Sequence, residues 1–345
     1  MFHPLRVADV ERLCADAVAV TFDVPSELEQ EFAFRPGQSL IVRRGDERRT
    51  YSICAPAGER PRIGVREVPG GVVSSWLVHD LRPGDRVDVA PPSGTFTPEL
   101  DRPGHHVLIA AGSGITPVLS IAASLLRHPE TQVSVLYGNR RADTVMFAEE
   151  LSDLKDRHPS RLELVHLLSR EAREVELLTG RLDAAKLRTL LPLLIDVDAV
   201  DHWWLCGPFG MVTDATEVLT EHGVSPERIH RELFWVDELP PEVVRADDAR
   251  PDGPSSEVTV QLDGRSTTVT VAEGETVLEG AQRARPDMPF ACKGGVCGTC
   301  RARVTDGEVR MRRNFALEPR EVAAGFVLTC QSTPLTEKVI VDFDD

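Results

Sequence analysis

The sequence predicts a multidomain chain in which an antiparallel β-barrel, a doubly wound α/β domain and a small α+β domain follow one another. Residues 1–102 carry short alternating runs such as AVAVTFDV and QSLIVRR, broken by Pro and Gly turns, which is typical of an antiparallel barrel or sandwich. In residues 103–235, strands such as HVLIAAG and QVSVLYG alternate with helical patterns such as ITPVLSIAASLLRH. Strands and helices in alternation predict a doubly wound parallel sheet.

The last part of the chain predicts a separate small domain behind a linker. Residues 236–255, VDELPPEVVRADDARPDGPS, are rich in Pro, Asp and Glu and predict an exposed linker. In residues 256–345, two strands of period 2 flank an Asp-Gly turn and a helix follows. Thr276 and Glu279 have the spacing of a capping box at the start of that helix.

Composition and charge exclude several classes of protein. The chain has 345 residues and a formal net charge of −16, which argues against non-specific binding to nucleic acid or to anionic lipid. No apolar stretch reaches the roughly 18 residues of a membrane helix, and the N-terminal sequence does not resemble a signal peptide. The seven cysteines are few and are not spread as a disulfide framework, so we expect a cytoplasmic protein.

Four of these cysteines carry the strongest chemical signal. CKGGVCGTC places Cys292, Cys297 and Cys300 within nine residues, and Cys330 follows in LTCQS. Structural zinc sites usually present two close pairs of ligands, whereas C-x4-C-x2-C with a distant fourth cysteine is the spacing of plant-type [2Fe–2S] ferredoxins. The intervening glycines can adopt positive φ and can direct backbone N–H groups at the cluster. The sequence therefore predicts a [2Fe–2S] centre.

A glycine-rich turn in AAGSGITP predicts a phosphate-binding site between a strand and a helix. Gly112 and Gly114 permit a tight turn and the close approach of a pyrophosphate, and Pro117 suits the first helical turn. Such turns often bind nothing, so the turn indicates a nucleotide only together with other motifs.

Those other motifs are RRTYSI, GGVVSSWL and CGPFGM. In this order and at these distances, they make residues 4–235 resemble the ferredoxin–NADP reductase superfamily. The C-terminal part resembles a plant-type ferredoxin, which implies a β-grasp fold. The resemblance implies that a reduced nicotinamide passes electrons to FAD and then to the cluster, where the cofactors carry the redox chemistry.

The resemblance also assigns roles to single residues. Arg49 would bind flavin phosphate, Tyr51 would pack on the isoalloxazine ring, and Ser52 would face its N5 edge. The turn and helix start at Gly71, Val72, Val73 and Ser74 would bind the pyrophosphate, which favours FAD over FMN. The nicotinamide nucleotide would lie against Gly112, Gly114, Thr116 and Pro117 and against Cys206, Gly207 and Pro208, with the Cys206 thiol near nicotinamide C4. Glu232 and Phe234 in HRELF would lie over the flavin, and Ser52, Cys206 and Glu232 are the expected catalytic residues.

The nucleotide is expected to be NADPH. Arg140 and Arg141 in YGNRR stand where the second strand of a nucleotide-binding sheet meets the adenosine ribose. The first carboxylate after this strand is that of Asp143, so no acidic residue lies nearby before it. An acidic residue there binds the 2′-hydroxyl of NADH, whereas arginine accommodates a 2′-phosphate.

Within the superfamily, YGNRR, CKGGVCGTCRARV, GEVRMRRNFALE and VLTCQSTPLTEKVIVDFD most resemble the reductase subunits of phenylacetyl-CoA epoxidases. The implied partner is the oxygenase component of a multicomponent monooxygenase. The reductase of a Rieske-type or steroid-ring hydroxylase is the alternative within the enzyme class. An electron carrier with a vestigial reductase part, or a subunit whose cluster is structural, are the other hypotheses. Lys293, Arg301 and Arg303 beside the cysteines predict a docking patch for an acidic partner.

Overall fold

The computed structural model describes residues 2–45, 47–234, 254–285, 287–317 and 319–344. The chain divides into two compact units, residues 1–235 and 236–345. Each has its own hydrophobic core among the described residues: two clusters lie in the first unit and one in the second. Among the described residues, none of the helices has the length and apolar character needed to cross a membrane.

The first unit begins with an antiparallel sheet that closes on itself. Its strand order is β4-β3-β6-β1-β2-β5, and α1 (Val72–His79) connects β5 to β6. Ile53, directly after β4, forms an antiparallel bridge with Ile63 of β5, so the two edge strands meet and the sheet is barrel-like. The strands are β1 (His3–Cys14), β2 (Ala17–Asp23), β3 (Ser39–Arg44), β4 (Glu47–Ser52), β5 (Arg62–Arg66) and β6 (Arg86–Ser93).

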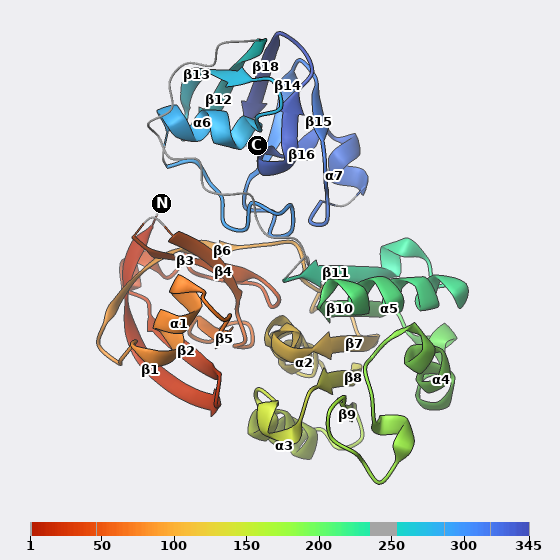
Figure 1. The fold of residues 1–345 in the computed structure, drawn as a ribbon. Helices are drawn as coiled ribbons and strands as arrows, with labels where there is room; N and C mark the ends of the chain where they lie inside the picture. Colours follow the sequence, from red (N-terminus) through yellow and green to blue (C-terminus); the bar gives the residue numbers. More distant parts are fainter. Residues whose placement is uncertain (1, 46, 235–253, 286, 318, 345) are drawn as a thin grey trace. The chain divides into compact units, whose positions relative to one another are not determined.

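A parallel sheet of order β11-β10-β7-β8-β9 follows in the same unit (Figure 1). The predicted doubly wound architecture is confirmed, and the order reverses between β7 and β10, where ligands bind in such sheets. The sequence did not reveal the helix α4 or the strand β11. The elements are β7 (His105–Ala111), α2 (Ile115–Leu125), β8 (Gln132–Asn139), α3 (Ala148–Arg157), β9 (Leu162–Leu168), α4 (Ala184–Leu194), β10 (His202–Gly207), α5 (Phe209–Glu221) and β11 (Ile229–Leu233).

The second unit is a mixed sheet of order β13-β12-β18-β14-β16, with the helix α6 (Val277–Ala284) packed on it. Asp263 and Gly264 both have positive φ, which is the hairpin turn that Asp-Gly predicts. The capping box is also present, because Glu279 N–H donates to Thr276 Oγ1 (3.3 Å) and Thr276 N–H donates to Glu279 Oε2 (2.9 Å). The strands are β12 (Ser255–Leu262), β13 (Arg265–Ala272), β14 (Arg301–Asp306), β16 (Phe326–Leu328) and β18 (Lys338–Asp342).

A short ribbon completes the second unit beside the cysteines. β15 (Val309–Met311) pairs with β17 (Ser332–Pro334) in an antiparallel ladder, and α7 (Pro319–Ala323) precedes β16. Because β17 begins two residues after Cys330, this ribbon lies next to the fourth cysteine of the predicted cluster.

Candidate functional site

The loops after β7 and β10 meet at the point where the strand order of the parallel sheet reverses. Gly112 has φ of 56°, a conformation that favours glycine, and it opens the turn before α2. A Cβ at Gly114 would lie 2.1 Å from the carbonyl oxygen of Cys206, so only glycine fits there. The predicted glycine turn and the predicted Cys206–Gly207–Pro208 stretch therefore lie against each other.

The start of α2 is held by its own side chains. Thr116 Oγ1 donates a 2.8 Å hydrogen bond to the carbonyl of Ser113. Thr116 and Pro117 are both buried in the first turn of α2. They hold the turn at Gly112–Gly114, whose backbone N–H groups are the donors that a pyrophosphate would use.

Three residues that the sequence singled out come together from distant parts of the chain. The buried Ser52 hydroxyl donates a 2.8 Å hydrogen bond to Glu232 Oε1, although 180 positions separate the two residues. Cys206 on β10 is the Cα partner of Glu232 on β11. Ser52, Cys206 and Glu232 therefore form one group of side chains, of which Ser52 and Cys206 are buried and Glu232 is half-buried.

Burial changes the acidity of this group. Desolvation raises the pKa of Glu232 to about 7, and the hydrogen bond from Ser52 only partly opposes it. Burial also raises the pKa of the Cys206 thiol well above its ordinary value, and the nearby charge of Glu232 raises it further. Near neutral pH, Cys206 is a neutral thiol and Glu232 can gain or lose a proton.

The predicted flavin residues lie on β4 and at the start of α1. Tyr51 is half-buried against the barrel core, and burial raises the pKa of its hydroxyl. Arg49 is exposed, and its Nη1 lies 2.8 Å from Glu47 Oε2. Phe234 is 36% exposed just after β11.

Glycine and serine build the turn before α1. Gly71 is the N-cap of α1, and a Cβ there would lie 2.6 Å from Ser74 Oγ. The Ser74 hydroxyl accepts a 3.1 Å hydrogen bond from Val68 N–H, so it holds the turn in place. Val72 is exposed and Val73 is buried. The first N–H groups of α1 have no partner inside the helix and fit the pyrophosphate of FAD.

Sequence reasoning missed a cation at this helix start. Arg44 Nη1 donates to the Val72 carbonyl (3.1 Å), and its guanidinium lies 4.9 Å from the centre of the Trp76 ring. Its positive charge next to the N-terminus of α1 supports an anionic ligand there. The motif spacing gave no signal for Arg44, because β3 precedes α1 by many residues.

The predicted ribose-binding arginines follow β8. Arg140 and Arg141 are both exposed, and Arg141 Nε lies 3.1 Å from Asp143 Oδ1. Arg170 N–H donates to the Arg140 carbonyl (2.8 Å), which places the loop after β9 beside them. The sequence had not indicated Asn139, whose buried carbonyl oxygen Oδ1 accepts no hydrogen bond from the described residues. This unsatisfied acceptor at the end of β8 fits a donor group on a nucleotide.

The four predicted cluster cysteines come together in two pairs. The thiol of Cys297 donates a hydrogen bond to Cys292, which lowers the pKa of Cys292 to about 5. The thiol of Cys300 donates in the same way to Cys330 and lowers its pKa. The two pairs also lie close enough to interact electrostatically. The charge of Cys297 raises the pKa of Cys300, and the charge of Cys292 raises the pKa of Cys330.

This pairing fits two irons. Among the described residues, no three His, Cys, Asp or Glu side chains converge as ligands of a single metal ion. Two thiol pairs, in contrast, match a cluster in which each of two irons takes two protein thiolates. The observed arrangement favours [2Fe–2S] over the zinc alternative.

The backbone of the cysteine loop supplies donors to sulfur. The N–H groups of Gly294 and Val296 lie 3.3 and 3.5 Å from Cys292 Sγ. Gly295 and Gly298 have positive φ as expected. Gly294 does not use this freedom, and Lys293 has a positive φ (51°) instead.

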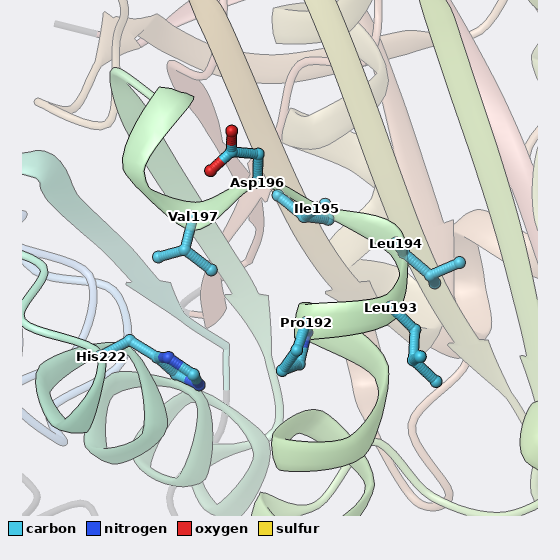
Figure 2. A pocket seen from close by; sticks show the side chains of 7 residues that line it. All are labelled: Pro192, Leu193, Leu194, Ile195, Asp196, Val197 and His222. Carbon is cyan, nitrogen blue, oxygen red and sulfur yellow. The ribbon is translucent and has the colours of Figure 1, made fainter.

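A hollow of about 510 Å³ lies elsewhere in the first unit, at the ends of α4 and α5 (Figure 2). None of the residues predicted to bind flavin, nucleotide or cluster lines it. Its lining residues are Pro192, Leu193, Leu194, Ile195, Asp196, Val197 and His222. It is open to solvent and shares no residue with the site described above.

Comparison with known protein families agrees with this geometry. Residues 4–97 match the oxidoreductase FAD-binding domain, residues 108–217 match the oxidoreductase NAD-binding domain, and residues 260–335 match the 2Fe-2S iron-sulfur cluster binding domain. The protein is a flavin- and iron–sulfur-dependent oxidoreductase that takes its electrons from a nicotinamide nucleotide.

Full-length relatives define the family more narrowly. The chain is 42% identical to one of the subunits of the 1,2-phenylacetyl-CoA epoxidase of Escherichia coli (strain K12), over 99% of this chain and 98% of that protein. It is 32% identical to the ferredoxin reductase component of 3-ketosteroid-9-alpha-monooxygenase of Rhodococcus rhodochrous, over 98% and 96%. The structure of phthalate dioxygenase reductase shares the fold, with a TM-score of 0.61, 24% identity, and 99% and 98% of the two chains covered. The chain belongs to the family of reductase components of multicomponent oxygenases.

Proposed function

We propose that this chain delivers electrons from NADPH to the oxygenase component of a phenylacetyl-CoA epoxidase. The group of Ser52, Cys206 and Glu232, against which the glycine turn of the nucleotide domain packs, is the observation that carries the proposal. The identity of 42% to a full-length component of such an epoxidase supports the choice of partner. A steroid-ring hydroxylase is the second candidate, because a reductase of that class is 32% identical over the full length.

The residues of the chain divide the work between three places. Arg49, Tyr51 and the start of α1 at Gly71–Ser74 hold FAD. Gly112, Gly114, Thr116, Pro117 and the Cys206–Pro208 stretch hold the nucleotide, and Phe234 covers the flavin side. The thiolates of Cys292, Cys297, Cys300 and Cys330 hold the cluster. When bound, FAD would take up a hydride, and FAD and the cluster would pass on its two electrons one at a time while the proton is released to solvent.

Within the flavin site, the side chains of Ser52, Cys206 and Glu232 orient the bound groups and hold a proton that can be exchanged. Glu232, with a pKa of about 7, can take up or release a proton, and the Ser52 hydroxyl, 2.8 Å away, would relay that proton while remaining a neutral hydroxyl. Cys206 remains a neutral thiol, so it excludes water beside the nicotinamide without repelling a negatively charged flavin. Arg140 and Arg141 bind the 2′-phosphate that distinguishes NADPH from NADH.

We also propose the domain limits 1–102, 103–235 and 256–345, joined by a linker over 236–255, which lies mostly outside the described residues. The family matches at 4–97, 108–217 and 260–335 support these limits.

A cytoplasmic location is proposed as well, because all seven cysteines are free of disulfides.

The test combines this chain with purified oxygenase subunits that lack their own reductase. With NADPH, the oxygenase subunits of the Escherichia coli phenylacetyl-CoA epoxidase should convert phenylacetyl-CoA to its epoxide, and those of the steroid monooxygenase should turn over far more slowly. Faster turnover with the steroid enzyme would replace the proposed partner by the alternative. Comparison of kcat/KM for NADPH and NADH, with ferricyanide as the acceptor, tests Arg140 and Arg141 separately.

A further inference from the structure

Two arginines lie along the edge of the cysteine loop in the second unit. On β15, Arg310 is paired with Thr333 of β17, and the next residue, Met311, is paired with Ser332. Beyond the strand, Arg312 N–H donates to the carbonyl of Gln331, the residue after Cys330 (2.8 Å). The backbone of Arg310–Arg312 therefore runs beside the loop that holds the fourth cysteine.

The same segment continues along the other three cysteines. Phe315 N–H donates to the Gly295 carbonyl (3.0 Å), inside the stretch from Cys292 to Cys300. A Cβ at Gly295 would lie 3.3 Å from the Arg313 carbonyl oxygen. The chain from β15 to Phe315 thus borders the cysteine loop on one side.

Arg310 and Arg312 direct their charge to solvent. Both are exposed, Arg310 within β15 and Arg312 directly after its end. Within the described part of the chain, neither guanidinium has a hydrogen bond or an ion pair. We define Arg310 and Arg312 as the arginine rim.

The patch predicted from the sequence is differently engaged. Arg301 Nε lies 3.1 Å from Glu321 Oε1, and its guanidinium carbon lies 3.5 Å from the centre of the Phe326 ring. Lys293 Nζ lies 4.8 Å from the centre of the Phe290 ring. These two cations are held within the second unit, whereas the arginine rim presents its charge outward.

Charge within the second unit is strongly divided. Residues 292–313 contain six Lys or Arg and two Asp or Glu. The remainder of residues 256–345 contains five and twelve, in a chain whose net charge is −16. The segment that holds three of the cysteines and the arginine rim is therefore positive on an otherwise acidic protein.

We propose that the arginine rim is the docking surface by which the second unit meets an acidic face of a separate electron-accepting protein. The proposal rests on the proposed function and adds the chemistry of the partner's surface. Opposite charge at the rim of an interface accelerates encounter and selects between partners.

The chain's own first unit is the competing occupant, because it is also acidic, with 26 Lys or Arg and 35 Asp or Glu in residues 1–235. A covalent tether, however, gives it an effective concentration on the order of millimolar without any charge steering. A separate protein must find the cysteine end by diffusion, so steering acts on that encounter.

Two protein acceptors of opposite charge test the rim. Rubredoxin is acidic and cytochrome c is basic, and each takes one electron. One NADPH therefore reduces two acceptor proteins and leaves NADP⁺ and one proton. In Arg310→Glu/Arg312→Glu, we expect the second-order rate of rubredoxin reduction at low salt to fall about tenfold or more and to lose its salt dependence. Cytochrome c reduction should become faster.

Lys338→Glu is the matched control for the single change Arg312→Glu, since each reverses one exposed positive charge. Lys338 begins β18, and the cysteine end of this sheet lies at the opposite end of that strand, where Asp342 pairs with Arg303. Its ammonium makes an exposed 3.4 Å ion pair with Glu257. An equal effect of Lys338→Glu would mean that net charge alone steers the acceptors, and it would overturn the proposal.

Reduction of the cluster by NADPH, without any acceptor, separates the remaining outcomes. We expect the rim variant to bleach at the wild-type rate. If bleaching slows while the acceptor step is unchanged, the rim serves the chain's own flavin unit and the proposal is wrong. If the wild-type cluster is not reduced by NADPH at all, the proposed function fails, and the docking surface fails with it.

Discussion

At the scale of single residues, burial of the Glu232 carboxyl couples the flavin site to the stability of the first unit. The carboxyl has one neutral partner, the hydroxyl of Ser52, and its strand neighbour Cys206 carries no positive charge. Ionisation is therefore opposed by desolvation, and the pKa rises to about 7. A carboxyl of this kind makes the folded state bind a proton that the unfolded chain has already released.

The first prediction follows from that proton. Between the unfolded pKa of about 4.5 and the folded pKa of about 7, the folded state binds more protons, so stability falls as the pH rises. From pH 5 to pH 8.5, the wild type should lose about 2–3 kcal/mol more unfolding free energy than Glu232→Gln. Urea unfolding of the flavin-free protein measures this by tryptophan fluorescence. Residues 236–345 contain no tryptophan, whereas Trp76, Trp203 and Trp204 lie in the first unit. Parallel pH dependences of the two proteins would contradict the shift.

Gln331 gives a second prediction at this scale. Its Nε2 donates to the carbonyls of Lys293 (2.8 Å) and Cys330 (3.0 Å) and lies 3.6 Å from Cys330 Sγ. Donors to sulfur stabilise the more negative, reduced cluster. Gln331→Met removes them, so the reduction potential should become more negative by about 40 mV, the equivalent of about 1 kcal/mol.

A potentiometric titration followed by electron paramagnetic resonance measures the potential of this variant. Gln261→Met on β12 makes the same exchange on a strand that does not pair with β14 and should leave the potential unchanged. A Gln331→Met protein with a full cluster and an unaltered potential would show that the amide does not act on sulfur.

At the scale of elements, the sequence predicted those whose signals are local. The Asp263–Gly264 turn and the capping box of α6 were predicted correctly because each depends on residues at most three positions apart. The helix α4 was not predicted, because Pro192 lies inside it and a proline interrupts the sequence pattern expected of a helix. The contact between Ser52 and Glu232 could not follow from spacing, because it depends on how β4 and β11 are brought together.

The junction of the α2 turn with β10 carries the element-scale prediction. Gly114→Ala would place a methyl group 2.1 Å from the Cys206 carbonyl oxygen, so the turn must move away from β10. We expect a loss of about 1–3 kcal/mol or more in the stability of the first unit, together with weaker nucleotide binding.

Gly210→Ala in α5 is the matched control, because nothing lies within 4 Å of its Cβ position. That change should be neutral or stabilising by up to about 1 kcal/mol. Equal melting temperatures for the two variants would contradict the close approach.

At the scale of the whole molecule, the two units contain separate cores. Buried apolar residues run from Leu5 to Leu233 in the first unit and from Val258 to Val341 in the second. Units with their own cores can unfold independently. Since Cys300 and Cys330 belong to the second core, the cluster should stabilise the second unit and not the first.

Cys297→Ser tests this division and the electron path together. Replacing a soft thiolate by a weakly basic hydroxyl should release the iron, since Cys297 is one half of a thiol pair. The first unit should keep its flavin, and its melting temperature by tryptophan fluorescence should stay within about 2 °C of the wild type. NADPH-dependent reduction of ferricyanide should persist within about a factor of two, because FAD and nucleotide lie in the first unit. Electron delivery to the oxygenase should fall by at least about 100-fold.

Cys54→Ser is the control, since this buried thiol lies in the core of the first unit and should lower the melting temperature without loss of iron. An iron-free Cys297→Ser protein that still supports full oxygenase turnover would show that electrons leave the flavin directly, and the cluster would then have a structural role.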